Sequence, residues 1–526
     1  MKSGGADAMK LNWGIVRRAV TGVLASIACL SAQATQAEGP MLTQVPGKPV
    51  LMLGAFDLAP LGYQTEEYFL SGTATSYKLP GGATADGKWD SAADSTAPYT
   101  SRIVVIRPTD PAKFNGTLLV EWFNVTAGQD TPADWMVAHR EMLRRGYAYV
   151  GVSAQKVGVE GGPTAMGQPA VPLKKADPAR YGSLVHPGDA FSFDIFSQAG
   201  AALKASILSN HAGPLGPLAP RRMLAIGESQ SAAFLTTYVN AVDPLARVYD
   251  GFLIHSRFGS SSPIDGVRGP NNRGNVPEHV AFRPDLRVPV LTFITETDLL
   301  GSRLPGYHAS RRPDDRNLRV WEVAGTAHAD NYLFMGAFMD SGSWPIADLA
   351  KVFRPATNSM MGKVDKPFNV GLPHHYVLQA SLAALDRWVK TGRAPASTPR
   401  LMLATGGKPG EPASLMTDAH GIAHGGVRTP WVDVPTMRLS GKGDPNSFIG
   451  MLAGSGEPFD KARLASLYPG GKADYLRRFT RSLDAAIRRG HVLREDRKEI
   501  LDIAAINFDE ASAAPPASTS TAPPGH

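Results

Sequence analysis

The chain has 526 residues, of which 43% are hydrophobic, with a formal net charge of +7 and one cysteine. This length allows a large core and more than one lobe. The positive charge is mild, and no basic run with interleaved aromatic residues is present, so the sequence argues against a nucleic-acid partner. Cys29 lies near the N-terminus, which leaves the rest of the chain without a disulfide or thiol chemistry.

Residues 1–37 have the pattern of a secretory signal. Basic side chains precede an apolar stretch at 19–30, and small residues follow it at the expected cleavage site. We predict cleavage near Ala34 or Ala37 and a periplasmic or secreted product. The apolar stretch is too short for a permanent membrane anchor. The residues before Cys29 match a lipoprotein signal poorly.

The next segment, 38–110, is rich in Gly, Thr, Ser and Tyr and has short alternating runs. We expect it to form a small β-rich lobe before the main sheet. The catalytic core is expected at 111–400. Strand-like runs at 117–123 and 147–153 flank a helical pattern at 134–145, and this alternation predicts a mostly parallel central sheet.

Two long Gly/Pro-rich segments, 156–187 and 256–287, interrupt the core. Loops of this length are usually lids or mobile segments, and we expect these two to form walls of a substrate pocket. Insertions without a role are the alternative. An amphipathic helix at 376–390 closes the core, and a C-terminal extension at 401–505 packs on it. Residues 506–526, which end in an Ala/Ser/Thr/Pro tract, are expected to be a disordered tail.

The most informative stretch is 223–240, where an apolar run meets Gly227-Glu228-Ser229-Gln230-Ser231 and a helical pattern follows. This strand–turn–helix context is typical of a nucleophilic serine in an α/β hydrolase. The turn is sharp, so the positions two before and two after Ser229 must be small, and Gly227 and Ser231 meet that requirement. The pentapeptide alone is weak evidence, because such strings also occur by chance.

A nucleophilic serine needs a base and an orienting acid, and in this fold the chain order is serine, acid, histidine. A β-branched run at 288–294 is followed by Glu296 and Asp298, and the next such run leads through a Gly-Thr-Ala turn to His328. We predict Ser229, Asp298 and His328 as the catalytic residues. Glu296 is the alternative acid.

The oxyanion that forms during acyl transfer must be stabilised by backbone N–H groups. One donor is expected to be Gln230, directly after the nucleophile. The other is expected in the loop after the strand at 117–123, where Val125 or Asn124 would supply it.

Other chemistries have weaker support. Strings beginning at Ser153, Tyr238 and Lys390 imitate the motifs of penicillin-binding proteins, but the first does not open a helix and the third ends one. His374 and His375 fit packing or a pocket wall better than a metal site. Since no metal-ligand spacing or glycine-rich nucleotide loop is present, we expect neither a metal nor another cofactor.

The chain also resembles a known family. Over roughly residues 48–505 it is similar to the bacterial proteins labelled "alpha/beta hydrolase domain-containing protein". The strings that carry the resemblance are Glu66–Ala74, Val120–Val125, Gly227–Ser231, Thr295–Asp298, Ala324–Asp330 and Gly425–Pro435. The resemblance implies the fold and a serine hydrolase mechanism, but no substrate.

The predicted fold is therefore α/β: an α/β-hydrolase fold with a mostly parallel central sheet, an N-terminal β-rich lobe, long lid-like insertions and a C-terminal extension. The predicted function is a secreted or periplasmic serine hydrolase that cleaves small-molecule carboxylic esters through an acyl-enzyme. An amidase, peptidase or lactonase with the same residues is one alternative. A non-catalytic binding protein on this scaffold is another. No pattern specifies an oligomeric state.

Overall fold

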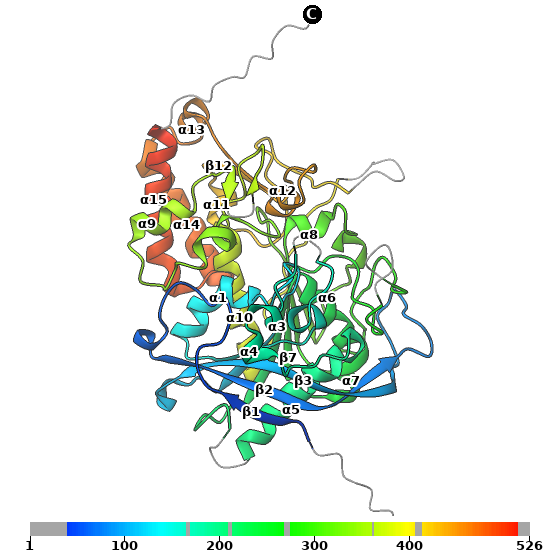
Figure 1. Cartoon of the computed structure of the whole chain (residues 1–526). Helices are drawn as coiled ribbons and strands as arrows, with labels where there is room; N and C mark the ends of the chain where they lie inside the picture. The colour runs from blue at the N-terminus through cyan, green and yellow to red at the C-terminus, as the bar shows by residue number, and fades with distance from the viewer. Residues whose placement is uncertain are drawn as a thin grey trace, which may run out of the picture. The chain divides into compact units, whose positions relative to one another are not determined.

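The computed structural model describes most of the chain, and its strands and helices carry the labels of Figure 1. The described residues are 39–164, 169–208, 213–267, 274–359, 362–404 and 413–513. The predicted signal at 1–37 and residues 514–526 of the predicted tail lie outside them.

One nine-stranded sheet organises the fold, in the order β1-β2-β3-β5-β4-β6-β7-β8-β9. Its first three strands pair antiparallel, as does β3 with β5, whereas the strands from β5 to β9 in this order run parallel. The strands are β1 (Met41–Val45), β2 (Tyr63–Lys78), β3 (Ala92–Pro108), β4 (Thr117–Trp122), β5 (Ala148–Val152), β6 (Arg222–Glu228), β7 (Gly251–His255), β8 (Val290–Ile294) and β9 (Leu318–Glu322).

The segment at 38–110 belongs to this sheet and does not form a lobe before it. β2 and β3 are long paired strands, and β3 continues the sheet by pairing with β5, with Ile103 opposite Val152 (Figure 1). The physical reason lies in Ile103–Ile106, a run of four apolar side chains with no exposed surface. A strand that is apolar on both faces belongs inside a sheet. The outer ends of β2 and β3 are polar and alternating, so the sequence did not reveal that their inner ends belong to the main sheet.

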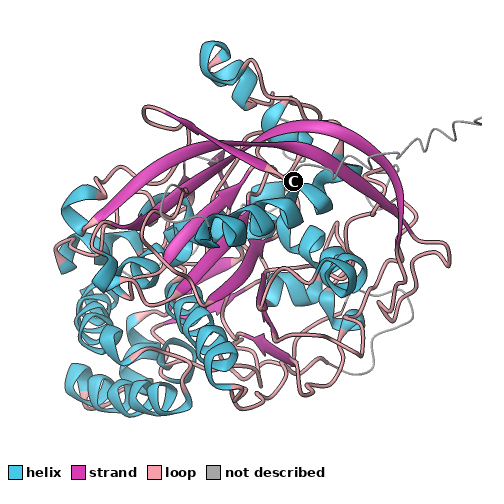
Figure 2. Ribbon diagram, turned by 90° about the horizontal axis from the view of Figure 1, so that it is seen from below, coloured by secondary structure: helices cyan, strands magenta, loops and turns pink. Residues whose placement is uncertain are grey.

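Helices lie on both sides of the strands (Figure 2). On one side, α5 (Ser192–Leu208) and α6 (Gln230–Thr237) pack against one set of strand side chains. On the other side, α1 (Ala133–Arg144) and α10 (Leu372–Thr391) pack against the alternate set. This arrangement follows from the period-two alternation of side chains along a strand.

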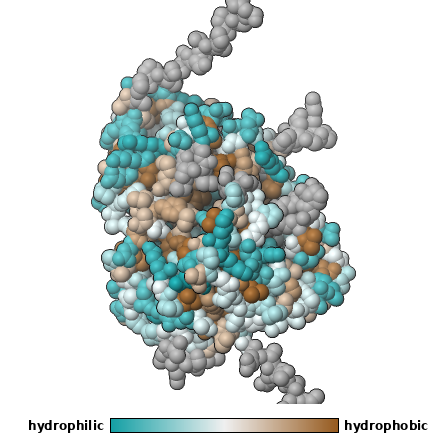
Figure 3. All heavy atoms as spheres, in the orientation of Figure 1, coloured by the Kyte–Doolittle hydropathy of each residue, from teal (hydrophilic) through white to brown (hydrophobic). Residues whose placement is uncertain are grey.

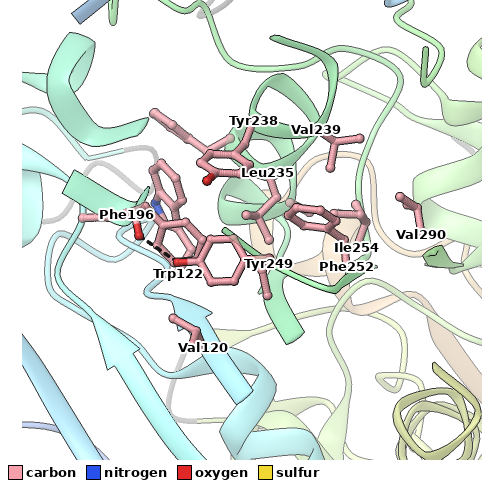
Figure 4. Close-up of a cluster of buried hydrophobic side chains, with 14 of the residues drawn as sticks. Val120, Trp122, Phe196, Leu235, Tyr238, Val239, Tyr249, Phe252, Ile254 and Val290 are labelled. Atoms are coloured by element: carbon pink, nitrogen blue, oxygen red, sulfur yellow. Dashed lines mark hydrogen bonds between the residues drawn. The ribbon is translucent and has the colours of Figure 1, made fainter. Parts of the chain in front are cut away.

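Strand β4 illustrates the alternation. Leu118 and Val120 join the cluster of α5 and α6, whereas Leu119 between them joins the cluster of α1 and α10. Figure 4 shows the first cluster, where the Trp122 ring lies 4.8 Å from that of Phe196. The Tyr249 hydroxyl donates to the backbone carbonyl of Phe196 at 2.7 Å, so this buried polar group is satisfied.

Both long insertions are fastened to the sheet or its helices. In the first, the buried Tyr181 hydroxyl donates to Glu67 of β2, and Val185 forms an antiparallel bridge with Thr100 of β3. In the second, the Ser262 N–H donates to the carbonyl of Ala233 in α6. The first insertion contains α2 (Lys156–Val159), α3 (Leu173–Ala176) and α4 (Pro178–Tyr181).

The remaining elements lie mostly in the C-terminal part of the chain. They are α7 (Asp243–Ala246), α8 (Glu296–Leu300), α9 (Ile346–Val352), β10 (Asn358–Ser359), β11 (Gly362–Lys363), α11 (Pro430–Asp433), β12 (Met437–Ser440), α12 (Phe448–Ala453), β13 (Ser455–Pro458), α13 (Lys461–Leu467), α14 (Gly471–Arg489) and α15 (Arg497–Ala513). A third apolar cluster joins α14 and α15 to Trp431 and Tyr376, and Arg140 of α1 pairs with Glu499 at 2.7 Å.

The expectation of disorder from residue 506 onward is wrong for residues 506–513, which belong to α15. Phe508 is buried and stacks on Tyr475 of α14, with ring centroids 4.7 Å apart. No glycine or proline interrupts residues 506–513, so the helix can continue, and one buried aromatic residue anchors it.

Among the described residues, no helix is long and apolar enough to cross a membrane. Hydrophobic and hydrophilic residues are intermingled on the face shown in Figure 3.

Candidate active site

Ser229 lies in the sharp turn between β6 and α6. Its backbone angles are φ 57° and ψ −113°, a conformation that residues with a side chain rarely adopt. Its N–H donates to the carbonyl of His255 at 2.9 Å. A Cβ on Gly227 would lie 2.8 Å from the Leu235 side chain and 3.1 Å from Cβ of Ser231. The predicted need for small residues around the serine therefore has a steric cause.

Ser229, His328 and Asp298 form a hydrogen-bonded chain. Nε2 of His328 lies 2.8 Å from Oγ of Ser229, and Nδ1 lies 2.6 Å from Oδ1 of Asp298. The three side chains come from the carboxyl ends of β6, β8 and β9, which meet at one edge of the sheet. Because Nδ1 faces a carboxylate, the lone pair of Nε2 is free to accept the serine proton.

The first turn of α8 fixes Asp298. Thr295 is the N-cap residue, and its N–H and hydroxyl both donate to Oδ2 of Asp298, at 2.8 and 2.7 Å. The other carboxylate oxygen is thereby aimed at the imidazole of His328.

Charge and burial act in opposite directions on His328. Burial lowers its pKa, but the negative charges of Asp298 and Glu228 outweigh that effect, so the pKa is raised above its usual value. The ring of Phe258, from the second insertion, lies 5.0 Å from the imidazole. The base is thus shielded on one face by an aromatic side chain, while Ser229 remains partly exposed.

Glu296, the alternative acid, does not contact His328. Its two oxygens accept the backbone N–H groups of Gly325, at 2.7 Å, and Gly441, at 2.8 Å. Burial raises the pKa of Glu296 to about 7, and these two donors oppose the shift. Glu296 thus ties α8 to the turn before His328 and to the C-terminal extension.

The loop after β4 supplies one backbone donor that faces Gln230. The N–H of Asn124 is bonded to the carbonyl of Thr131 at 3.0 Å, so it is already in use. The N–H of Val125 donates to the side-chain oxygen of Gln230 at 3.2 Å. Of the two predicted alternatives for the second oxyanion donor we therefore retain Val125, beside the N–H of Gln230 at the start of α6.

The C-terminal extension holds the turn that carries His328. The N–H of Ala329 donates to the carbonyl of Leu452 at 3.0 Å, and the N–H of Ala324 donates to the carbonyl of Val427 at 3.1 Å. These contacts lie on either side of the histidine along the chain. The extension is therefore part of the framework of the site.

The comparisons with known proteins agree with this architecture. Residues 31–502 match the family model Abhydrolase_10, described as "Alpha/beta hydrolase domain". The chain belongs to this family. The resemblance stated from the sequence and the predicted fold class are thereby confirmed. A search of curated proteins finds no match for this alpha/beta hydrolase.

Several solved structures are similar to this chain at low identity and low TM-score. Esterase Est22 is 14% identical, with a TM-score of 0.26, over 47% of this chain and 68% of that chain. A putative dienelactone hydrolase from Klebsiella pneumoniae is 12% identical, with a TM-score of 0.25, over 46% and 88%. Acetyl xylan esterase 1 from Thermoanaerobacterium sp. is 11% identical, with a TM-score of 0.26, over 54% and 81%.

Sequence reasoning missed the role of Glu228 in this alpha/beta hydrolase. One oxygen of Glu228 lies 3.4 Å from Nε2 of His328, and the other accepts the side-chain amide of Asn124 at 3.1 Å. Burial raises the pKa of Glu228 to about 8, and the nearby His328 opposes the shift. The only signal in the sequence was a carboxylate next to Ser229, at a position that the nucleophile motif leaves open.

The two adjacent histidines differ in their surroundings. His375 packs against Tyr332, with ring centroids 3.8 Å apart, and its Nδ1 lies 3.0 Å from the carbonyl of Val137. His374 instead forms polar contacts with His255 and Asp330. The expected packing role thus describes the surroundings of His375 only.

Proposed function

We propose that this alpha/beta hydrolase is a serine hydrolase that cleaves carboxylic esters through an acyl-enzyme. The observation that carries the proposal is the hydrogen-bonded chain from Ser229 Oγ through His328 to Asp298, on a strained turn at the carboxyl edge of the sheet. Strain of this kind gathers at functional sites, and this arrangement activates a serine.

In the proposed reaction, Oγ of Ser229 attacks the ester carbonyl while Nε2 of His328 takes its proton. Asp298 holds the imidazole and stabilises its charged form. The tetrahedral oxyanion is bound by the N–H groups of Gln230 and Val125, which requires the Gln230 side chain to release the Val125 N–H. His328 then protonates the leaving alcohol. Water, deprotonated by His328, hydrolyses the acyl-enzyme.

The same residues would serve an amidase, a peptidase or a lactonase, and the leaving group decides among these. A non-catalytic binding protein is the second class of function, because the fold alone never fixes an activity. A panel of p-nitrophenyl esters, anilides and lactones distinguishes an esterase from an amidase, a peptidase or a lactonase. A fluorophosphonate probe separates any active serine hydrolase from a binding scaffold.

We also propose that the protein is exported to the periplasm or secreted, because residues 1–37 have the composition of a signal peptide. The hydrolase would then encounter its ester substrate outside the cytoplasm.

The deciding experiment compares Ser229→Ala with Ser231→Ala. Removing the nucleophile is expected to lower kcat by about a millionfold and to abolish probe labelling, with the fold retained. Ser231 is the matched control, because its buried Oγ has no hydrogen-bond partner among the described residues. The control should keep nearly normal activity. A folded Ser229→Ala protein with normal turnover would end the proposal.

A further inference from the structure

A row of four buried side chains lies beside the Ser229 turn. Asp134 Oδ1 is 2.8 Å from His255 Nδ1, the Nε2 atoms of His255 and His374 are 2.7 Å apart, and His374 Nδ1 is 2.9 Å from Asp330 Oδ2. No member is more than 2% exposed. The row joins α1, β7, α10 and the loop after His328 (Figure 1).

The geometry fixes the number of protons in the row. Two imidazole nitrogens 2.7 Å apart repel each other unless one proton lies between them. Each contact between a carboxylate and Nδ1 needs another proton, which makes three. However these protons are distributed, two aspartates and two histidines with three protons carry a net charge of −1. Burial, and then the charge of His374, lower the pKa of His255 well below its usual value, which favours His255 as the neutral acceptor.

A bridging metal ion does not fit between the two rings. Zinc–nitrogen bonds of about 2.0–2.1 Å in tetrahedral geometry separate two ligand nitrogens by about 3.3 Å. The observed separation of 2.7 Å between His255 and His374 is the distance of a direct hydrogen bond.

Two members of the row, His255 and Asp330, reach the proposed catalytic residues through the backbone. The carbonyl of His255 accepts the N–H of Ser229. Asp330 follows His328 by two residues, and its other oxygen accepts the N–H of Leu333 at 3.0 Å. A Cβ on Gly371 would lie 2.4 Å from Asp330, so the start of α10 closes tightly around this carboxylate.

We propose that His255 and His374 share one buried proton, and that the row Asp134–His255–His374–Asp330 is a positioning device that holds the Ser229 turn at the correct distance from the His328 loop. The effect on catalysis rests on the proposed function, whereas the shared proton does not. His255, His374 and Asp330 are positioning residues, because none of them touches Ser229 Oγ or the ring of His328.

The row makes stability depend on pH in a characteristic way. In the unfolded chain each histidine titrates near ~6.5, so at that pH the pair holds an average of three protons, as in the folded row. Below that pH the unfolded chain binds more protons, so the stability rises with pH. Above it the folded row binds more, so the stability falls as pH rises. The contribution of the row therefore peaks near pH ~6.5.

Other titratable groups face the row from the elements packed against it. They are Glu121 of β4, Tyr149 of β5, Glu228 of β6, Asp298 of α8 and His328. Their charges shift the pH of the maximum, but they do not change the proton count of the row.

The first test detects the shared proton in the wild-type protein. With histidine labelled at ¹⁵Nε2, a far-downfield proton resonance coupled to the label is expected at pH 6.5. It should persist in Ser229→Ala, which keeps the row intact, and vanish in His374→Gln. Absence of the resonance from the folded wild-type protein would overturn the shared proton, whatever the activity of the enzyme.

The second test measures unfolding as a function of pH for the wild type and the double variant His255→Gln/His374→Gln, whose row does not titrate as an imidazole pair. The ratio of their unfolding constants should pass through an extremum near pH ~6.5 and change by up to about tenfold per pH unit on either side. A flat ratio would contradict the proposal. If the double variant does not fold, the resonance test still decides.

The third test addresses positioning. A misplacement of about 1 Å can cost about a hundredfold in rate, so His374→Gln is expected to lower kcat by about ten- to a hundredfold with KM little changed. His375→Gln is the matched control, since His375 is equally buried but lies outside the row. Unchanged kcat in His374→Gln would overturn the positioning role. Failure of the proposed function would appear separately, as normal turnover in Ser229→Ala.

Discussion

Each residue of the candidate site is held by contacts that leave it one useful orientation. The strained backbone of Ser229 is anchored by the carbonyl of His255, and Asp298 is fixed by two donors from Thr295. This anchoring makes the effect of some substitutions predictable. A substitution that keeps the shape of a side chain but exchanges a hydrogen-bond acceptor for a donor must break a known contact.

Asp298→Asn should therefore damage catalysis more than Glu296→Gln. The asparagine oxygen would stay with the donors of Thr295, which turns its NH₂ group toward Nδ1 of His328 and forces the wrong tautomer. The expected loss in kcat is about ten-thousandfold. Glu296→Gln instead sets an NH₂ group against a backbone N–H, so it should mainly lower the melting temperature. Kinetics and thermal unfolding of both variants, side by side, decide the assignment, and it must be exchanged if Glu296→Gln is the kinetically crippled variant.

The pH dependence follows from the charges around His328. The imidazole must be neutral to accept the serine proton, and its pKa is raised because Asp298 and Glu228 outweigh the effect of burial. The acidic limb of the kcat/KM profile for a simple ester should therefore lie above pH ~6.5. Burial raises the pKa of Glu228 to about 8, so near pH ~6.5 this carboxyl is mostly protonated and Asp298 supplies most of the charge that acts on His328. Glu228→Gln should therefore move the limb only slightly, toward lower pH, and a shift of a full pH unit would show that Glu228 is ionised in this range.

The sequence predicted the three side chains of the hydrogen-bonded chain because motif and chain order both constrain them. It favours Asp298 as the acid but leaves Glu296 open as the alternative, because both follow the same strand and only the first turn of α8 sets the directions of their side chains. Backbone donors such as the Val125 N–H leave no signature in the sequence. The buried row Asp134–His255–His374–Asp330 was not predicted, because its members are far apart along the chain and only the fold brings them together.

At the scale of elements, the parallel strands and the helices that flank them were predictable from their periodicity. The N-terminal strands were not, because the polar outer ends of β2 and β3 look like a separate lobe while their inner ends extend the main sheet. The C-terminal extension was expected only to pack on the core. Its contacts with Ala324, Glu296 and Ala329 give it a further role, since it holds the turn that carries His328.

Gly441→Ala tests that role. A Cβ at Gly441 would lie 2.4 Å from the backbone nitrogen of Thr297 and 2.5 Å from Cβ of Glu296, so the start of α8 must shift. We expect a loss of about 1–3 kcal/mol in stability and a fall in kcat, because α8 carries Asp298. Gly81→Ala is the control, since nothing lies within 4 Å of its added Cβ. Equal kcat for the two variants would show that the extension does not position the acid.

At the scale of the whole molecule, the described structure is held together without covalent cross-links. Its apolar clusters lie on the two faces of the sheet and among the C-terminal helices. The chain has one cysteine, Cys29, and it lies within the predicted signal. The stability of the described structure should therefore not depend on the redox state of its surroundings.

The mature protein is expected to begin just after Ala34 or Ala37 and to lack Cys29. Signal peptidase accepts small residues at the cleavage site, such as those at Ala34 and Ala37. The residues before Cys29 match a lipid-attachment signal poorly. N-terminal sequencing and the intact mass of protein from the periplasm or medium check this, and a thiol reductant should leave the melting temperature unchanged. Cys29→Ser should be exported and processed like the wild type, because the predicted cleavage removes that position. Recovery of a chain that begins at a lipid-modified Cys29 would show instead that the enzyme acts while tethered to a membrane.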